Sequence, residues 1–490
     1  MTNSLLGTAS RRRTGTLTAA SVLTAGLIFA VPGATSAATQ SAPPVPGWVS
    51  GEQIAPGVEL LHYRDETITA PRTAPRELSI VRIDPAVAGL RVESTTGKKA
   101  GTAETVRDQL IGQPRKPYAA INGSYFMLEG RSADPAADSV QSFGLVVRDG
   151  EVLGAACTRE SDRPSLILQY GVPRIANLST TMKVSRKDAP GTKSYDLDDV
   201  NRNPGGAMAC QREPGDGLPD GDDADTKPDK VAYQDPHGKS VAAWPDATEF
   251  VLFTDSYGMT TPTKDLNPHI ASDDEAGFEV ELDKDGKITN AWDTRGGRLV
   301  RPGYRNLQVI GAEETAWLKS MRDAGASLAV SQTVTDLDLG KELPLDESVD
   351  IVSGGDVLIK DGKDRGLAGS CTGRLDPPTG DQQICRSSRT AVAVDKQGRT
   401  LLLTVTGPLA PEKPADKVDG AFFPEVTRAL MACGAMDAIN LDGGGSTTLL
   451  TRPAAEDTLI RRSGVTDSTG ERAVFDTVYA GAGGNPVSKP

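Results

Sequence analysis

Short runs of β-branched and aliphatic residues, joined in pairs by glycine-containing turns, most constrain the fold. Asp149-Gly150 connects two such runs, and Asp-Gly is typical of a two-residue hairpin turn because both central residues of a type I′ turn have positive φ. The pattern predicts hairpins at residues 143–154, 277–289 and 390–405. A chain built from such pairs favours sheets in which sequence neighbours are antiparallel.

Helical patterns are fewer, at residues 103–111, 312–324 and 424–433. The last begins with Pro424 and is followed by Gly434, the usual punctuation of a helix. Strands and helices do not alternate regularly, which argues against a doubly wound parallel sheet. We therefore expect an α+β fold with β-rich mixed sheets and a few packed helices.

The N-terminus has the pattern of an export signal. Three arginines at 11–13 precede an apolar stretch at 17–31 and small residues at 36–38. This pattern predicts a signal peptide over residues 1–38, followed by a Pro/Ser-rich linker over residues 39–49. Since no later apolar run has membrane length, we expect a secreted, extracellular protein without a stable membrane span.

Charge and histidine content exclude several functions. The 490 residues contain 53 basic and 66 acidic side chains, a formal charge of −13, which argues against nucleic acid as the main partner. Only three histidines are present, with no His-Glu-x-x-His or Cys-x-x-Cys motif, so no metal site of that kind is predicted.

An acidic, Pro/Gly-rich and apolar-poor segment at about residues 204–246 predicts an exposed insertion. Its clustered acids are Asp216, Asp220, Asp222, Asp223 and Asp225. Their spacing does not fit an EF-hand loop, so a solvated loop is favoured and bound calcium remains the alternative. No other cofactor is expected.

Five cysteines leave one thiol unpaired in an oxidising compartment. Cys433 lies on the apolar face of a predicted helix, so we expect it to be the buried free thiol. Cys371 and Cys385 bracket a polar loop, residues 371–385, and would close it as a disulfide. Cys157 and Cys210 would form the other pair.

The stretch AINLDGGGSTTLL at residues 438–450 is the best candidate for a site. An apolar strand ends in Asp442, and Gly443, Gly444, Gly445 and Ser446 follow. Successive glycine amides can form an anion-binding nest, to which the serine hydroxyl adds a donor. The alternative is a tight turn between two buried strands.

Three other polar motifs follow or begin apolar strands: Asn122-Gly123, Ser353-Gly354-Gly355 and Arg389-Thr390. An asparagine amide can donate and accept hydrogen bonds, which suits a sugar hydroxyl, although Asn-Gly is also a common turn. A guanidinium at residue 389 could bind a phosphate with two hydrogen bonds.

In this order, the motifs INGSYF, VSGGDVLI, SRTAVAVDKQGRTLLLTV and AINLDGGGSTTLL resemble the phosphodiester glycosidase family. The resemblance extends over roughly residues 50–485 and implies one domain of this type. It further implies an exported hydrolase that cleaves the bond between a sugar anomeric carbon and phosphate in a sugar-1-phosphodiester of the α-N-acetylglucosamine type. A phosphodiester-linked sugar or cell-wall polymer would be the substrate.

By motif position, the resemblance implies that the site contains Asn122, Gly123, Ser353, Gly354, Gly355, Arg389, Thr390, Glu425, Asp442, Gly443, Gly444, Gly445 and Ser446. Two departures stand out: Ser387-Ser388 precede Arg389, and Thr406-Gly407-Pro408 replaces a common Asp-Gly-Arg.

The chemistry of such a bond suggests roles for these residues. A phosphate monoester leaving group has a second pKa of about 6, so donors and positive charge can stabilise it. Arg389 and the glycine amides suit this role, and Asp442 is the first candidate for the required carboxylate. Glu425 is the second candidate, although an acid in the first turn of a helix also favours the helix dipole.

Two other function classes remain open. The first is a non-catalytic cell-wall glycan-binding protein on the same scaffold. The second is a calcium-dependent phosphodiesterase, which would leave the phosphate on the sugar.

Overall fold

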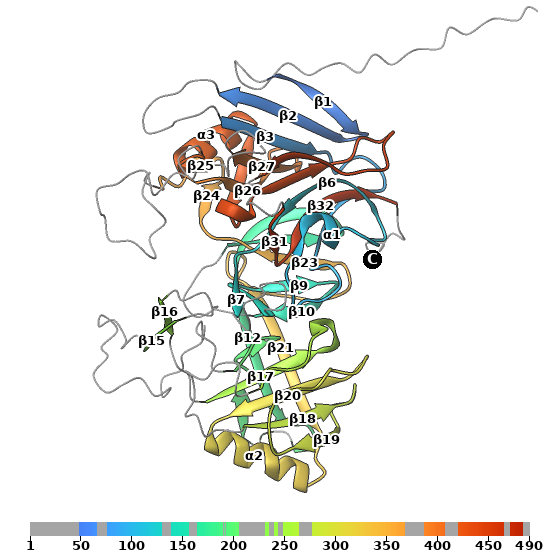
Figure 1. Cartoon of the computed structure of the whole chain (residues 1–490), viewed down its shortest axis with the longest axis vertical. Coiled ribbons are helices and arrows are strands. Elements are labelled where there is room, and N and C mark those ends of the chain that lie inside the picture. Colours follow the sequence, from blue (N-terminus) through green and yellow to red (C-terminus); the bar gives the residue numbers. More distant parts are fainter. Residues whose placement is uncertain are drawn as a thin grey trace, which may run out of the picture. The chain divides into compact units, whose positions relative to one another are not determined.

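The protein is built mainly of β-sheets, as the computed structural model shows (Figure 1). The structure describes residues 49–65, 76–129, 139–155, 164–189, 191, 193–204, 231–234, 240–243, 248–263, 277–367, 387–406, 420–464 and 471–483. Within these ranges the expectation of β-rich sheets with few helices is confirmed. The predicted signal peptide, the proposed calcium ligands and the loop at 371–385 lie outside the described residues.

The first sheet has eight strands, and β27 lies at its centre. Its strands, in order, are β1 (Val49–Ala55), β2 (Val58–Asp65), β3 (Arg76–Ile83), β27 (Thr400–Thr406), β26 (Arg389–Asp395), β28 (Ala435–Asn440), β24 (Val357–Lys360) and β25 (Lys363–Asp364). Figure 1 shows β3 next to β27, although the two are far apart in the sequence.

Both faces of the central strands are covered by apolar groups. Leu401 and Leu403 of β27 face α3 (Phe423–Ala432) and contribute to one core cluster. Leu402, between them, points to the opposite face and contributes to a second cluster with residues of another sheet. Since alternate residues of a strand face opposite sides, burial on both sides explains the continuous apolar sequence of β27.

The second sheet supplies the other side of that core. It comprises β30 (Ile460–Gly464), β29 (Thr448–Thr451), β6 (Lys116–Asn122), β32 (Thr477–Ala482) and β4 (Leu90–Thr95). Ile121 of β6 and Leu449 of β29 join the cluster that contains Leu402. The two sheets therefore pack face to face, and the polar ends of β6 and β28 lie close to each other.

Two further sheets enclose a separate core. One comprises β10 (Glu151–Gly154), β9 (Val146–Arg148), β23 (Val349–Ser353), β11 (Pro164–Gln169), β12 (Val172–Arg186), β21 (Leu328–Asp336) and β22 (Lys341–Leu343), with β13 (Ser194–Asp196) beside β12. The other comprises β14 (Asp199–Val200), β17 (Glu249–Thr254), β20 (Arg305–Ile310), β18 (Phe278–Leu282) and β19 (Ile288–Trp292). Leu318 of α2 (Ala312–Asp323) completes the core between them.

Three short strand pairs complete the description: β5 (Glu104–Thr105) with β31 (Ala473–Val474), β7 (Phe126–Glu129) with β8 (Ser139–Ser142), and β15 (Val231–Gln234) with β16 (Ser240–Ala243). The strand pairs in the described ranges are antiparallel except for β14 with β17. None of the helices in these ranges combines the length and apolar character that a membrane crossing requires.

The three predicted hairpins are confirmed, as β9–β10, β18–β19 and β26–β27. Asp149 and Gly150 have φ of 48° and 77°, the positive values expected of a type I′ turn. The predicted helices near residues 312–324 and 424–433 are confirmed as α2 and α3.

The predicted helix at residues 103–111 is wrong over most of its length, because only one turn forms, α1 (Val106–Gln109). Residues 104 and 105 pair with β31 instead. The Thr105 hydroxyl then accepts a hydrogen bond from the amide of Asp108, so the helix begins only after this cap. Pairing with a distant strand has overridden the local helical pattern.

Cys433 is free and 6% exposed, so the expected buried thiol is confirmed. Burial raises its pKa to about 11, which keeps the thiol protonated and poorly reactive at neutral pH. The predicted pairs Cys157–Cys210 and Cys371–Cys385 lie outside the described residues.

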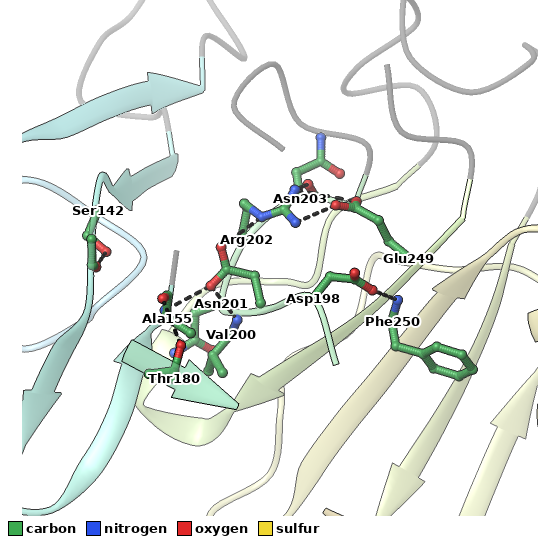
Figure 2. A network of polar contacts seen from close by, with 12 residues as sticks. Ser142, Ala155, Thr180, Asp198, Val200, Asn201, Arg202, Asn203, Glu249 and Phe250 are labelled. Carbon is green, nitrogen blue, oxygen red and sulfur yellow. Dashed lines mark hydrogen bonds and ion pairs between the residues drawn. The ribbon is translucent and has the colours of Figure 1, made fainter. Parts of the chain in front are cut away.

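A buried ion network connects two of the sheets (Figure 2). The guanidinium of Arg202, 2% exposed, forms ion pairs with Asp199 at 2.9 Å and with Glu249 of β17. The other oxygen of Asp199 accepts a hydrogen bond from the amide of Ala155, just after β10, at 2.9 Å. Asp199 of β14 thus links the segment after β10 to the sheet that contains β14 and β17, and Arg202 balances the charges of Asp199 and Glu249 within that sheet.

Candidate active site

The four motifs predicted from the sequence meet at the polar ends of β6, β23, β26 and β28. The amide of Leu441 donates to the carbonyl of Thr390 at 2.9 Å, and the amide of Asp442 donates to the carbonyl of Gly123 at 3.0 Å. The amide of Gly355 donates to the carbonyl of Asn440 at 2.8 Å. Backbone hydrogen bonds therefore connect all four motifs around the turn that begins at Asp442.

Asn122, at the end of β6, is fully buried and connects the other motifs. Its Oδ1 accepts hydrogen bonds from Thr390 Oγ1 at 2.9 Å and from the Thr448 amide at 3.1 Å. Its Nδ2 donates to the carbonyl of Asp442 at 2.7 Å. Because both ends of the amide bind protein groups, we interpret Asn122 as a residue that positions Asp442 and not as a ligand for a sugar hydroxyl.

The glycine turn after Asp442 requires residues without side chains. Gly444 opens the short 3₁₀ turn η6 (Gly444–Ser446) with a φ of 58°, which disfavours larger residues. A Cβ at Gly443 would lie 2.7 Å from the carbonyl oxygen of Ser388. The amide of Gly444 donates to that carbonyl at 2.8 Å, so this amide is directed at Ser388 and away from any bound anion.

Arg472 places a positive charge beside this turn. A Cβ at Gly445 would lie 2.9 Å from Arg472 Nη1, so the missing side chain lets the guanidinium approach. The positive charge of Arg472 lowers the pKa of Asp442. Because Arg472 is exposed, its guanidinium is available to a ligand that carries negative charge.

Asp442 itself has an altered acidity. Burial raises its pKa to about 7, although the Ser446 hydroxyl and Arg472 partly oppose the shift. The nearby carboxylate of Asp476 acts in the same direction as burial. A carboxyl group with a pKa near neutrality can exist in either protonation state at physiological pH, as acid–base and nucleophilic chemistry requires.

Asp476 is a second buried carboxyl group at the site. It accepts hydrogen bonds from the amide and the hydroxyl of Ser124, at 2.5 and 2.8 Å. The Ser124 hydroxyl in turn accepts a hydrogen bond from the amide of Ser353 at 3.1 Å. Burial raises the Asp476 pKa to about 6, and the bonds from Ser124 oppose this change. Asp476 therefore holds the Asn122-Gly123 and Ser353-Gly354 turns together.

Tyr125 is close enough to Asp442 and Arg389 for both charges to affect its pKa. Burial and the charge of Asp442 raise its pKa above the usual value, whereas the charge of Arg389 lowers it. The Tyr125 hydroxyl accepts a hydrogen bond from Asn440 Nδ2. A Cβ at Gly355 would lie 2.9 Å from the Tyr125 ring, so Gly355 leaves space for that ring.

Arg389 is mostly buried at the start of β26. Its Nε donates to the carbonyl of Ala421 at 3.1 Å, and its guanidinium lies 4.2 Å from the centre of the Phe423 ring. Burial lowers its pKa, and the negative charge of Asp356 opposes this change. An arginine remains charged at physiological pH even when its pKa is lowered. Arg389 therefore contributes a permanent positive charge close to the site.

Glu425 occupies a different environment. Its Oε1 forms an ion pair with Arg76 at 2.8 Å, and its Oε2 accepts a hydrogen bond from the Phe422 amide at 2.9 Å. It also lies in the first turn of α3, where an acid favours the helix dipole. Since both carboxylate oxygens bind groups that hold the helix start, this geometry favours a structural role for Glu425.

The two departures from the family pattern have different positions. Ser388 acts through its backbone, because its carbonyl accepts the hydrogen bond from Gly444. Thr406 is the last residue of β27 and is buried. Gly407 and Pro408 lie outside the described residues.

Sequence reasoning missed Arg472, Asp476 and Tyr125. Only Tyr125 carried a local signal, as part of the INGSYF motif. Asp476 and Arg472 are isolated charges without a recognisable motif around them. Asp476 is separated from Ser124 by 352 positions, so only the fold brings the two residues together.

These features define a β-rich protein with a carboxyl group of raised pKa, arginines and a glycine turn at one site. Residues 273–480 match the sequence model of the phosphodiester glycosidase family. The resemblance inferred from the motifs is thereby confirmed over these residues. They include Asp442, Arg389 and the turn at Ser353, but not Asn122.

Similarity in fold to solved structures covers more of the chain than residues 273–480. A protein from Burkholderia pseudomallei, named as a presumed exported protein, shares 23% identity with a TM-score of 0.63, covering 84% of this chain and 75% of the other. A hypothetical protein from Synechocystis shares 17% identity with a TM-score of 0.54, covering 89% and 64%. These similarities establish the fold alone. No curated protein matches the chain.

Zebrafish N-acetylglucosamine-1-phosphodiester α-N-acetylglucosaminidase, in the structure of a catalytic domain auto-inhibited by its pro-peptide, shares 14% identity. The alignment covers 89% of this chain and 86% of that chain. The TM-score is 0.35, and a structural similarity this low supports no argument about this protein.

Proposed function

We propose that this protein is an exported hydrolase that cleaves the bond between a sugar anomeric carbon and the phosphate of a sugar-1-phosphodiester. The supporting observation is Asp442, with a pKa raised to about 7, on a glycine turn within the matched family region. The signal-like residues 1–38 and the name of the Burkholderia pseudomallei protein support export.

The geometry suggests a division of roles. The Asp442 carboxylate would stabilise positive charge at the anomeric carbon, or activate water, as carboxylates do in glycoside hydrolysis. Arg472, exposed beside the turn, would bind the departing phosphate, and the mostly buried Arg389 would add a second positive charge close to it. Asn122 and Asp476 would hold the turns in place. The sugar is proposed to be of the α-N-acetylglucosamine type, on the basis of the family resemblance alone.

Product analysis tests this proposal. We expect the mature protein to convert an α-N-acetylglucosamine-1-phosphodiester into free sugar and a phosphate monoester. Reducing ends and the monoester would be measured by chromatography and mass spectrometry, with and without a chelator. Release of sugar 1-phosphate would instead indicate cleavage on the other side of phosphorus. Binding without either product would indicate a glycan-binding protein.

The pH dependence should report the ionisation of Asp442. Because its carboxylate is the proposed active form, kcat/KM should rise with pH and level off above a pKa near 7. At a pH two units lower, only roughly one hundredth of the maximum should remain. The profile would be measured under conditions where substrate binding is not saturated.

Arg472 provides a matched check on this assignment. Its positive charge lowers the pKa of Asp442, so Arg472→Gln should move the rising limb to higher pH. If kcat/KM of this variant rises over the same pH range as in the wild type, a group other than Asp442 controls the pH dependence.

A further inference from the structure

A cavity of about 510 Å³ lies away from the Asp442 turn, at the opposite ends of β6 and β29. Lys116, the first residue of β6, lines the cavity, whereas Asn122, the last, lies at the candidate active site. At about 3.3 Å per residue, these two ends are roughly 20 Å apart. The volume falls within the range of small-molecule sites, roughly 300 to 1,000 Å³.

Four basic residues line the cavity, and two of them are held by the surrounding protein. Arg107 donates to the carbonyl of Leu459 at 2.8 Å and to Glu471 at 2.9 Å. Arg115 forms an ion pair with Glu93 at 2.5 Å. The bond from Arg107 to Leu459 ties the loop that follows β29 to α1, and the Arg115–Glu93 pair ties the segment after α1 to β4, so this part of the cavity wall has a defined shape.

The other two basic residues are available to a ligand. Lys116 forms a loose ion pair, 3.7 Å from Asp457, and the Asp457 side chain is fully exposed. Arg452 lines the cavity, and its side chain is only partly buried.

Apolar side chains form the rest of the lining. Leu110 and Leu459 contribute to it, and Ile111 is 60% exposed although it is a large apolar residue. Basic donors next to an exposed apolar surface suit a ligand that has both an anionic group and a carbon skeleton. Guanidinium and ammonium groups together favour a phosphate, which offers several acceptor oxygens.

We propose that this cavity binds a phosphorylated polyol or sugar, with its phosphate held by Arg452 and Lys116 and its carbon skeleton against Ile111 and Leu459. This site is separate from the Asp442 turn. The proposal does not depend on the proposed hydrolase activity.

Isothermal titration calorimetry with glycerol 1-phosphate tests the site. Asp442→Asn should bind it as the wild type does, since the active-site carboxyl group is not involved. Arg452→Gln should weaken binding by about tenfold or more, because a charge-assisted hydrogen bond is lost. Arg452→Gln should also keep the thermal midpoint of the wild type, which separates loss of binding from loss of fold.

Arg462→Gln is the matched control. Arg462 lies on β30, donates to Thr451 Oγ1 at 2.7 Å and to Glu52 at 2.7 Å, and does not line the cavity. The Arg462→Gln variant should bind glycerol 1-phosphate as the wild type does. Unchanged binding by Arg452→Gln, an equal loss in Arg462→Gln, or equally strong binding of uncharged glycerol would each overturn the proposal.

Discussion

Replacement of Asp442 by Asn should lower kcat/KM for a sugar-1-phosphodiester by about a thousandfold or more, while the protein stays folded. The amide has almost the same shape as the carboxyl group but cannot become negatively charged. It can therefore neither stabilise positive charge at the anomeric carbon nor accept a proton from water. Steady-state release of free sugar, measured near neutral pH, checks this result.

The same substitution should preserve or increase stability. Burial raises the pKa of Asp442 to about 7, which means that the folded environment disfavours its charged form. Above that pH, a neutral side chain removes this unfavourable burial of charge. Loss of activity together with an equal or higher thermal midpoint would separate a chemical role from a structural one.

Glu425→Gln is the matched control for this variant. The geometry favours a structural role for Glu425, because Arg76 and the Phe422 amide bind its two oxygens. We expect stability to fall by about 1–2 kcal/mol as a partly buried ion pair and a helix cap weaken. We expect kcat/KM of the folded protein to remain near that of the wild type. Full turnover by Asp442→Asn, or an equal loss of activity in both variants, would contradict the assignment of Asp442.

Arg202→Met should destabilise the protein by about 3–5 kcal/mol, as expected when one partner of a buried ion network is removed. The variant would leave Asp199 and Glu249 close together, buried and without the cation that balances them (Figure 2). It would also loosen the connection between Ala155 and β17. Urea unfolding, followed by circular dichroism, measures the change in free energy of unfolding.

The exposed pair Arg186 and Asp188 offers a matched control, at 2.7 Å and with both side chains in contact with solvent. Arg186→Met should change stability little, because water already screens the two charges. If both arginine variants unfold at the same urea concentration as the wild type, the Arg202 network does not stabilise the fold as described.

Local sequence signals predicted much of the fold. The hairpin at β9–β10 was predictable from Asp149 and Gly150, since their positive φ values suit a type I′ turn. Helix α3 was also predictable from the sequence, because Pro424 and Gly434 mark its ends. The helix predicted at residues 103–111 was wrong because β5 pairs with β31, more than 300 positions away, and no local pattern reports such a pairing.

The candidate site was predictable in part for the same reason. Asp442 and the motifs at Asn122, Ser353 and Arg389 could be found because each combines an apolar strand with residues of special chemistry. The contacts that Asn122 and Glu425 make with other parts of the protein could not be predicted, because an amide or carboxylate has the same sequence pattern whether it faces a ligand or the protein.

The sequence by itself determined the hairpins, two of the helices, the buried thiol of Cys433 and the family resemblance, all of which depend on neighbouring residues. The tertiary structure alone decided the pKa of Asp442, because burial and the distant residues Arg472 and Asp476 set it. It also placed Arg202 between two acids and Arg452 at the wall of a cavity. Such properties depend on which groups become close in space when water is excluded, and electrostatic interactions between those groups are strong only there.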